Sequence, residues 1–285
     1  MRCIALLYNQ AKPEACSIIE HITPLLESAN ITVFELEVGV GVEAEKSLER
    51  LRDVELAFVL GGDGTLLGVA RQLAPLGIPI LGVNVGHLGF LTESEPDDVE
   101  EAVRRVIECE YDLENRLMIE ASVFRQGKRI RTGIGLNDIG ITKGSFARMV
   151  TIDVHVDGIY VDTFSGDGVI ISTPTGSTAY SLSCGGPIVS PHLQVMVVTP
   201  ICPHTLFSRP FVIDDKQETE LRVHAAHHDL CLTIDGQVGV RLEPEDVIRI
   251  KRSDYHTTLV KWRDREFFTV LRQKLHNTGL LYRQT

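Results

Sequence analysis

Apolar residues in the first part of the chain form short continuous runs that alternate with stretches of helical spacing. The runs cover residues 3–8, 31–36, 56–60 and 78–83. The stretches of helical spacing cover residues 15–29, 42–51 and 96–110. Short apolar runs between turn-forming residues are typical of buried strands, and their alternation with helices is typical of a parallel sheet. The pattern therefore predicts a Rossmann-like α/β domain.

Two prolines bear on the first predicted helix. Pro13 stands at its beginning, where the missing N–H of proline costs no helical hydrogen bond. Pro24 lies inside it, where the ring removes one backbone hydrogen bond and crowds the preceding turn. We therefore expect Pro24 to kink or divide this helix.

After about Asn115 the rhythm changes to a period of two. Strand-like stretches of this kind cover residues 149–156, 168–172, 219–224, 230–234 and 247–250. Such a series predicts an antiparallel or sandwich-like domain. Asp157-Gly158 and Asp235-Gly236 each stand between strand-like segments. They predict tight hairpins, because glycine accepts a positive φ.

Helical spacing returns over residues 264–275, and we expect this tail to pack back on the first domain. The predicted fold class is α/β plus all-β. A Rossmann-like domain covers residues 1–115 together with the returning tail 254–285. A β-sandwich-like domain covers residues 116–253.

Composition and charge narrow the class of protein. Hydrophobic residues make up 44% of the 285 residues and charged residues 24%, as in ordinary globular proteins. The formal net charge of −11 argues against a nucleic-acid partner, which would require clustered Lys and Arg. No apolar stretch reaches membrane-spanning length, and the six cysteines include no C-x-x-C pair. We expect a cytoplasmic protein with reduced cysteines and without a membrane, nucleic-acid or zinc partner.

A glycine turn follows the predicted strand at residues 56–60. It reads Gly61-Gly62-Asp63-Gly64-Thr65 and leads into apolar residues of helical spacing. Glycine lets the backbone approach an anion, and the free amides and dipole of a helix start attract it, so this loop is a candidate phosphate site. Asp63 would repel phosphate there unless it accepts a hydroxyl proton or holds Mg²⁺. The alternative is a plain turn in which Asp63 caps the helix.

A second glycine-rich stretch, residues 82–90, follows the next predicted strand. The carboxyl ends of parallel strands lie along one edge of the sheet, so both loops are expected to face one crevice. Asn84 is a candidate to hydrogen-bond a ribose or a phosphate. Phe90 is a candidate to stack on a base, although a core position is the commoner case for phenylalanine. His87 is expected to be structural rather than a catalytic base.

Hydroxyl groups are concentrated behind one strand of the second half. Residues 173–180 read Thr-Pro-Thr-Gly-Ser-Thr-Ala-Tyr, and Ser183 follows closely. Hydroxyls and small residues suit a neutral polar ligand such as an amide, an adenine edge or a sugar; the alternative is a surface loop. Asn137, Asp138 and Asp167 are further polar residues amid apolar strands, and each alone could be a turn residue.

In order along nearly the whole chain, these stretches resemble the NAD kinase family. Residues 61–65 are similar to its GGDGT signature, 82–90 to its GVNxGxLGF loop, 136–139 to its Asn-Glu segment and 173–187 to its TPTGSTAYxxSxGGP stretch. The first motif is shared with lipid kinases, whereas the last is specific. The resemblance implies phosphoryl transfer from ATP or polyphosphate, with Mg²⁺, to the 2′-hydroxyl of NAD. It also implies homodimers or homotetramers whose NAD site lies at a subunit contact.

The resemblance assigns roles to individual residues. Asp63 is similar to the family's catalytic aspartate near the NAD 2′-hydroxyl. Asn137 and Asp138 match a pair that contacts the adenosine, and Asp138 stands where glutamate is usual, so its reach is one methylene shorter. Asp167 resembles a carboxylate that holds the nicotinamide end. Ser165 stands where many bacterial relatives carry arginine, which predicts weak discrimination against NADH.

The resemblance also implies a wider set of binding residues. Thr178, Ala179 and Tyr180 resemble the lining of the dinucleotide pocket, and the hairpin of Asp235 and Gln237 resembles a loop near the pyrophosphate. The full predicted set is Gly61, Gly62, Gly64, Thr65, Asn84, Phe90, Asn137, Asp138, Asp167, Thr175, Ser177, Thr178, Ala179, Tyr180, Ser183, Asp235 and Gln237. No residue is assigned to a metal, because Mg²⁺ is expected to arrive with the donor nucleotide.

Three other functions stay open from the residues alone. A diacylglycerol-type lipid kinase would share the first glycine loop but would need a broad apolar acceptor pocket. A non-catalytic NAD(H)-binding regulator would keep the cleft but would not need Asp63. A serine hydrolase would use Ser177, but the surrounding Gly-Ser-Thr-Ala lacks the G-x-S-x-G elbow and no histidine is evidently paired with it.

Overall fold

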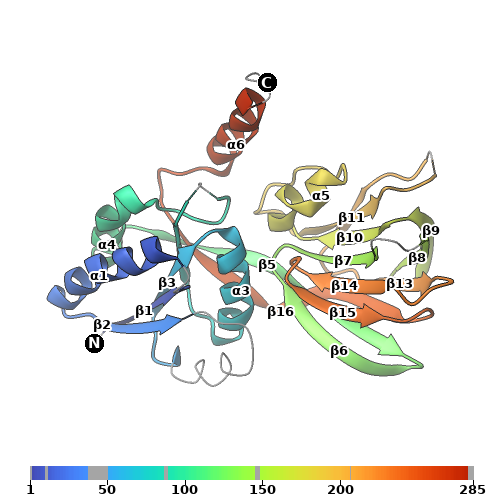
Figure 1. The fold of residues 1–285 in the computed structure, drawn as a ribbon, viewed down its shortest axis with the longest axis horizontal. Coiled ribbons are helices and arrows are strands. Elements are labelled where there is room, and N and C mark those ends of the chain that lie inside the picture. The colour runs from blue at the N-terminus through green and yellow to red at the C-terminus, as the bar shows by residue number, and fades with distance from the viewer. Residues whose placement is uncertain are drawn as a thin grey trace. The chain divides into compact units, whose positions relative to one another are not determined.

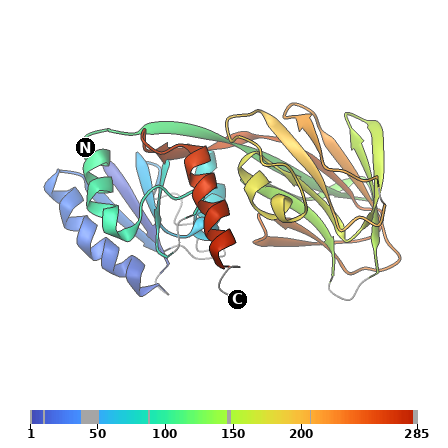
Figure 2. The ribbon, with the colours of Figure 1, turned by 90° about the horizontal axis from the view of Figure 1, so that it is seen from above.

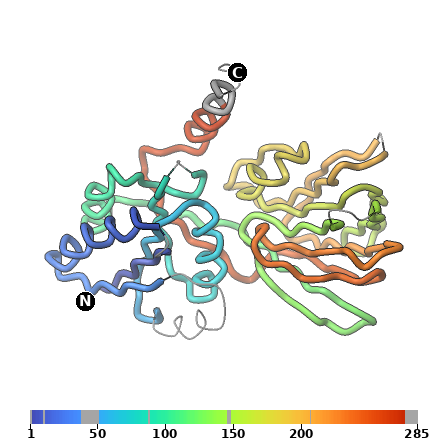
Figure 3. The backbone as a smooth tube through the Cα atoms, viewed as in Figure 1, coloured from blue at the N-terminus to red at the C-terminus, as the bar shows by residue number. Residues whose placement is uncertain are grey.

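The computed structural model describes residues 2–9, 12–37, 51–86, 89–144, 148–205 and 207–281, with side chains described as far as Leu275. The chain divides into two compact units, Met1–Asn115 with Thr257–Thr285, and Arg116–His256 (Figure 1). The chain passes from the first unit into the second along β5 (Asp112–Arg125) and returns along β16 (Val247–Lys261) (Figure 3). His87 and nearly all of the predicted helix at 42–51 lie outside the described residues.

The first unit is a parallel sheet with helices, and its strands follow the order β2-β1-β3-β4. These strands are β1 (Cys3–Tyr8), β2 (Thr32–Glu37), β3 (Leu56–Gly61) and β4 (Ile80–Asn84). The helices are α1 (Pro13–Ser28), α3 (Asp63–Leu73), α4 (Val99–Ile107) and α6 (Phe267–Leu281), with short 3-10 turns at Ala74–Leu76 and Pro96–Asp98. The four apolar runs are thus confirmed as strands of a parallel α/β sheet.

Alternate side chains of these strands face opposite sides of the sheet. Ile4, Leu6 and Phe58 pack with apolar residues of α1 and α4 in one hydrophobic cluster. The buried residues of α3 do not belong to that cluster, and Figure 2 shows α3 on the other side of the strands. Right-handed crossovers produce this arrangement, because the chain moves one way along the sheet after β1 and the opposite way after β3.

The expected division of the first helix at Pro24 is wrong. α1 continues through Pro24 to Ser28. Its apolar face is buried on both sides of the proline, by Ile18, Ile22 and Leu26 among others. An interior proline costs about 3 kcal/mol, whereas burial of each such side chain contributes about 1.5–3 kcal/mol. Packing against the sheet therefore holds the helix together across the missing hydrogen bond.

The second unit contains two sheets. One has the order β16-β13-β8-β9, with β5 beside β16 and β6 beside β5, and the other has the antiparallel order β12-β11-β10-β7-β14-β15. Its remaining strands are β6 (Lys128–Gly135), β7 (Asp138–Lys143), β8 (Val150–Val156), β9 (Ile159–Gly166), β10 (Gly168–Ser172), β11 (Val195–Ile201), β12 (Phe211–Asp214), β13 (Thr219–His224), β14 (Leu230–Ile234) and β15 (Val238–Leu242). One cluster of buried residues joins Ile152 and Leu221 of the first sheet to Ile141 and Val198 of the second. The predicted sandwich-like fold is confirmed.

Both predicted Asp-Gly hairpins are present. Asp157 (φ 51°) and Gly158 (φ 78°) join β8 to β9, and Asp235 (φ 51°) and Gly236 (φ 64°) join β14 to β15. Two consecutive positive φ angles define the type I′ turn, whose twist matches that of the flanking strands.

The C-terminal tail belongs to the first unit. Val270 of α6 is buried, whereas Phe268 and Leu275 are 65% and 52% exposed. Val270 therefore packs within its unit, whereas Phe268 and Leu275 face solvent.

Two further features concern membrane-spanning helices and the state of the cysteines. In the part of the chain that the structure describes, no helix is both long and apolar enough to cross a membrane. All six cysteines are free thiols.

Candidate active site

The first glycine loop joins β3 to α3 at the carboxyl edge of the parallel sheet. Gly62 is the N-cap, with extended backbone, and Asp63 is the first residue of the helix. No side chain of the described residues caps this helix start, and the beginning of a helix is a place where backbone amides and the helix dipole can bind an anion. A Cβ at Gly61 would lie 2.5 Å from Thr65 Oγ1, which shows that Thr65 folds over the loop.

Asp63 binds the second glycine loop and does not cap its own helix. Its Oδ2 accepts a hydrogen bond from Phe90 N at 2.9 Å, and its Oδ1 accepts one from Leu91 N at 3.1 Å. Gly89 approaches so closely that a Cβ there would overlap Asp63 Oδ1. Gly89 N in turn donates to Thr92 Oγ1 at 3.1 Å. The structure therefore fixes the carboxylate between two loops, and each oxygen keeps capacity to accept another hydrogen bond.

The two glycine loops lie side by side, as expected from the parallel sheet. Gly61 and Asn84 are paired in the register of β3 and β4, and Val85 N donates to Gly61 O at 3.2 Å. Asn84 is 1% exposed, and its Nδ2 has no hydrogen-bond partner among the described residues. A buried donor of this kind costs about 1–3 kcal/mol unless a ligand or water accepts from it. The Phe90 ring is half-buried, with Lys274 Nζ 5.4 Å from its centroid.

In the second unit, the Asp235 hairpin meets the segment between β6 and β7. The Asp235 carboxylate accepts hydrogen bonds from three consecutive amides, those of Leu136 (3.1 Å), Asn137 (2.7 Å) and Asp138 (3.1 Å). Asp235 N donates to Asp138 O at 2.9 Å. Asp235 itself is only 8% exposed. This carboxylate is therefore enclosed by the backbone that it holds.

The same segment also holds the hydroxyl-rich stretch. Leu136 O accepts from Thr173 Oγ1 at 2.6 Å, and Asn137 O accepts from Thr173 N at 2.9 Å. Gly176 packs so closely that a Cβ there would overlap Asn137 O. Three predicted stretches that lie far apart in the sequence thus meet around residues 136–138.

The hydroxyl groups of this stretch have different surroundings. Ser177 is fully buried; its Oγ donates to Pro174 O at 2.7 Å and accepts from Val189 N at 3.0 Å. Thr178 Oγ1 donates to Thr175 O at 3.2 Å. The side chains of Tyr180, Ser183 and Gln237 are exposed, and those of Thr178 and Ala179 are half-buried. Ser177 is thus bonded within its own turn, which leaves no exposed serine nucleophile at the position the hydrolase alternative requires.

Arg116 is a charged residue at this site that the sequence patterns do not indicate. It is 4% exposed, and its guanidinium NH1 donates to Thr175 Oγ1 at 3.3 Å. A single arginine in a strand of mixed pattern is normally solvent-facing, so only the fold shows that this one lies beneath the hydroxyl-rich stretch.

Asp138 differs electrostatically from its neighbour Asp235. Asp138 is 5% exposed. Burial, together with the negative charge of Asp235, raises the pKa of Asp138 to about 7. Near neutral pH this carboxyl group is therefore divided between its protonated and ionised forms, and the protonated form can donate a hydrogen bond.

Asp167 lies beside a lysine side chain that the sequence patterns did not indicate. Lys143 Nζ, at the end of β7, lies 3.4 Å from Asp167 Oδ1. Ser165, where the sequence resemblance implies an arginine, places its Oγ 3.2 Å from Thr151 Oγ1. Partial burial, the nearby cysteines and the charge of Asp167 raise the pKa of Tyr180. A positive charge is thus supplied beside Asp167 from another strand.

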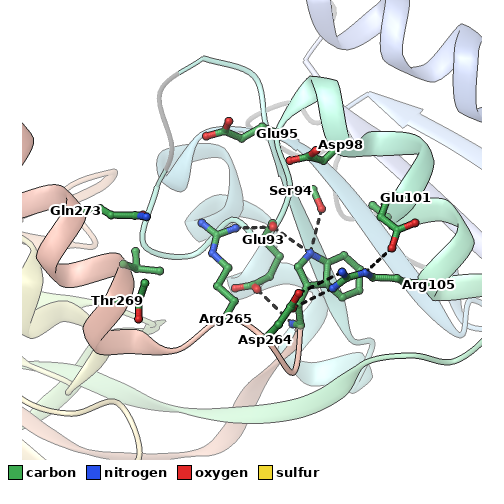
Figure 4. A pocket seen from close by; sticks show the side chains of 13 residues that line it. Glu93, Ser94, Glu95, Asp98, Glu101, Arg105, Asp264, Arg265, Thr269 and Gln273 are labelled. Atoms are coloured by element: carbon green, nitrogen blue, oxygen red, sulfur yellow. Dashed lines mark hydrogen bonds and ion pairs between the residues drawn. The ribbon is translucent and has the colours of Figure 1, made fainter.

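The first unit also contains a cavity of about 500 Å³ between the segment after the second glycine loop and the C-terminal tail (Figure 4). The buried Glu93 forms an ion pair with Lys261 and accepts from Trp262 N at 3.3 Å. Arg105 forms an ion pair with Asp264 at 3.0 Å. Glu93 and Arg105, two charged residues that line the cavity, are thus each paired with a residue of opposite charge. Glu93 anchors the chain two residues beyond Leu91, which binds Asp63.

Nothing in the described residues forms a metal centre of the protein's own. Among them, no three His, Cys, Asp or Glu side chains come together in a way that could hold a metal ion.

Comparison with family models and curated relatives gives consistent matches. Residues 4–111 match the model described as the ATP-NAD kinase N-terminal domain, and residues 136–262 match the ATP-NAD kinase C-terminal domain. The chain is 44% identical over 283 residues to the NAD kinase of Moorella thermoacetica, covering 98% of this chain and 91% of that protein. It is 46% identical over 238 residues to the NAD kinase of Caldanaerobacter subterraneus, covering 84% of each.

Solved structures resemble the whole fold. A yeast NADH kinase complexed with NADH matches with a TM-score of 0.84 and 22% identity, covering 97% of this chain and 88% of that one. An NAD kinase from Archaeoglobus fulgidus in complex with ATP matches with a TM-score of 0.77 and 25% identity, covering 96% of this chain and 98% of that one.

Proposed function

The chain belongs to the NAD kinase family, and on this premise we propose that it transfers the γ-phosphoryl group of ATP to the 2′-hydroxyl of the adenosine ribose of NAD. The observation that carries the proposal is the position of Asp63, a carboxylate on a glycine loop suited to phosphate. The 2′-oxygen attacks the γ-phosphorus, Asp63 takes the hydroxyl proton, and the bond from the γ-phosphorus to the bridging oxygen of ADP breaks. The products are NADP and ADP.

The loop of Gly61 to Thr65 is proposed to hold the donor phosphates. A Cβ at Gly62 would meet no atom within 4 Å, so the surface above this residue is open. Backbone amides and the helix dipole can bind an anion there despite the net charge of −11. Asn84 Nδ2, buried and without a protein partner among the described residues, suits a hydroxyl or phosphate oxygen of the substrates.

ATP is the proposed donor, and Mg²⁺ is proposed to reach the site bound to its phosphates. The match to the ATP-NAD kinase models and the likeness to a relative solved with ATP support this donor over polyphosphate. The described residues hold no cluster of metal ligands, so a carboxylate such as Asp63 would meet the metal only as part of the nucleotide complex.

The second unit is proposed to bind NAD. Asn137 and Asp138 would contact the adenosine, Thr178, Ala179 and Tyr180 would line the dinucleotide pocket, and Asp167 would hold the nicotinamide end. The half-buried or exposed positions of Asn137, Thr178 and Tyr180 leave them accessible to a ligand. We assign Ser177 and Thr175 to holding the turn beneath, because their hydroxyls bond to Val189 and Arg116. A cytoplasmic homodimer or homotetramer is the proposed form.

The base role of Asp63 is tested by Asp63→Asn. General-base contributions are typically about a hundred- to ten-thousandfold, so kcat should fall at least about a hundredfold. The Kd for NAD should change less than about threefold, because the NAD contacts are assigned elsewhere. The measurement is formation of NADP from NAD, Mg²⁺ and either ATP or polyphosphate, coupled to an NADP-specific dehydrogenase.

The same assay on the parent protein tests the donor. Product from polyphosphate and none from ATP would overturn the proposed donor.

Thr92→Ala is the matched control. Asp63→Asn also weakens the second loop, because the amide nitrogen of asparagine cannot accept from Phe90 N or Leu91 N. Thr92→Ala removes the hydrogen bond from Gly89 N in the same loop but keeps the carboxylate. Its kcat should stay within about tenfold of the parent, since one lost neutral hydrogen bond is worth about 1 kcal/mol. Equal losses in the two variants would mean that Asp63 acts through the loop and not as a base.

A further inference from the structure

Asp235 is placed to hold backbone and not to meet a ligand. Both of its carboxylate oxygens accept hydrogen bonds from residues 136–138, and the side chain is almost fully buried. A Cβ at Gly135 would lie 3.0 Å from Asp235 Oδ1, so glycine there permits the close approach. Hydrogen bonds from backbone amides to a carboxylate are stronger than those to a neutral acceptor. Three of them to consecutive amides fix the path of the chain between β6 and β7.

The segment fixed in this way carries two of the residues proposed to contact NAD. Asn137 and Asp138 are consecutive residues, and the backbone N–H of each points to Asp235. The backbone of Asn137 is also held by Thr173, whose N–H donates to Asn137 O at 2.9 Å, and Gly176 packs closely against the same carbonyl. Because the backbone is fixed, the directions in which the Cα–Cβ bonds of Asn137 and Asp138 leave it are fixed as well.

We propose that Asp235 is a positioning residue for NAD: it holds Asn137 and Asp138 in the orientation that binds the adenosine, without itself contacting the dinucleotide. This inference rests on the proposed function for the contact between these two residues and NAD. It departs from the pyrophosphate contact that the sequence resemblance implies for the hairpin. Gly236 and Gln237, both exposed, remain available for such a contact, whereas the Asp235 carboxylate is enclosed.

The other Asp-Gly hairpin supplies a matched control. Asp157 has the same φ of 51° and stands in the same position of its turn. Its carboxylate also accepts hydrogen bonds at 3.0 Å, from Glu218 N and Gln217 Nε2, but these partners belong to the surface. Replacement of either aspartate by alanine therefore imposes the same backbone strain and removes similar bonds. Only Asp235 is bonded to residues 136–138.

The experiment compares Asp235→Ala, Asp235→Asn and Asp157→Ala in the full chain. Calorimetry measures the Kd for NAD, steady-state kinetics gives KM and kcat, and thermal melting reports folding. For Asp235→Ala we expect the Kd and KM for NAD to rise at least about tenfold, about 1.4 kcal/mol, with kcat and the KM for ATP within about threefold. Asp157→Ala should leave both NAD values within about twofold of the parent.

Asp235→Asn should recover most of the NAD affinity. Its remaining oxygen can still accept from Asn137 N and Asp138 N, which share Oδ1 in the structure. This variant also keeps the test decisive if Asp235→Ala does not fold, because asparagine suits the same turn. Its Kd should stay within about threefold of the parent, and a rise as large as that expected for alanine would overturn the positioning role.

Three other results would overturn the proposal. The first is an unchanged Kd for NAD in folded Asp235→Ala, and the second is an equal rise of this Kd in Asp157→Ala. The third is a loss of kcat of a hundredfold or more with unchanged Kd, which would make Asp235 part of the chemistry. Calorimetry detects NAD binding without turnover, and parent protein that binds NAD but forms no NADP would refute the proposed function alone.

Discussion

At the scale of single residues, two neighbouring aspartates show how surroundings decide the behaviour of a carboxyl group. Asp235 has three amide donors. Asp138 is buried beside that negative charge, and its pKa rises to about 7. Burial raises the pKa of the Cys184 thiol, and the charge of Asp138 adds to this rise. The sequence presents Asp138 and Asp235 as two similar polar residues among apolar strands.

The raised pKa of Asp138 predicts a stability that falls with pH. Its pKa in the folded chain lies above the ordinary value of 3.8, so the folded state holds the proton more tightly than the unfolded state. The free energy of unfolding should therefore decrease as pH rises from about 4 to about 7 and then level off, a change on the order of a few kcal/mol. The Asp138→Asn variant has no carboxyl group at this position, so it lacks this contribution to the pH dependence.

The check is thermal melting of both proteins at pH 5 and pH 8. Relative to the asparagine variant, the parent should lose at least about 4 °C between the two pH values, since 1 kcal/mol corresponds to about 2–4 °C for a chain of this size class. All other titratable groups are present in both proteins, so the comparison isolates Asp138. A constant difference in Tm would show that Asp138 ionises as freely in the folded chain as in the unfolded one.

At the scale of elements, the two strand–loop connections use glycine for different reasons. Gly62 borders open space, where only a ligand would meet an added side chain. Gly89 lies against Asp63, so an added Cβ would displace the carboxylate itself. In the sequence both residues are simply glycines of glycine-rich motifs. The structure shows that Gly62 faces open space and that Gly89 packs against Asp63.

This difference predicts that two alanine substitutions change different kinetic constants. Gly62→Ala should keep Tm within about 4 °C, because the extended backbone of Gly62 accepts alanine and the poorer N-cap costs about 1 kcal/mol. It should raise the KM for ATP at least about tenfold. Gly89→Ala should lower kcat at least about a hundredfold, because Asp63 can no longer reach Phe90 N and Leu91 N together. Steady-state kinetics with varied ATP separates the two. An unchanged KM for ATP in Gly62→Ala would remove the loop from the donor site.

At the scale of the whole molecule, each unit has its own hydrophobic core. Phe58 belongs to the cluster of the first unit and Phe164 to that of the second, and both side chains are at most 2% exposed. The two aromatic residues therefore form a matched pair for testing whether the units unfold separately.

We expect Phe58→Ala and Phe164→Ala each to destabilise mainly the unit that contains it. A phenylalanine removed from a core costs about 3–5 kcal/mol. Hydrogen exchange followed by mass spectrometry should show lost protection in β1 and β3 for Phe58→Ala, and in β8 and β14 for Phe164→Ala. If either substitution lowered protection equally in both sets of strands, the two units would unfold as one cooperative block.

The sequence by itself determined the four parallel strands of the first unit, several strands of the second, the glycine loops, the Asp-Gly hairpins and the order of the two units' folds. These features depend on short-range patterns: apolar runs of strand length, the positive φ of glycine, and the helical or alternating period of side chains. The GGDGT loop was also readable, because strand, turn and helix follow one another directly in the chain.

Tertiary structure decided which groups these elements bring together. Residues 99 apart in the sequence, Leu136 and Asp235, are hydrogen-bonded, and Asp63 binds amides 27 and 28 residues away. Lys143 supplies the cation beside Asp167, and α1 continues through Pro24 because packing offsets the lost hydrogen bond. Local sequence pattern limits the conformation of each segment. Long-range partners depend on how sheets and loops pack, and the spacing of residue types along the chain does not show which distant residues come into contact.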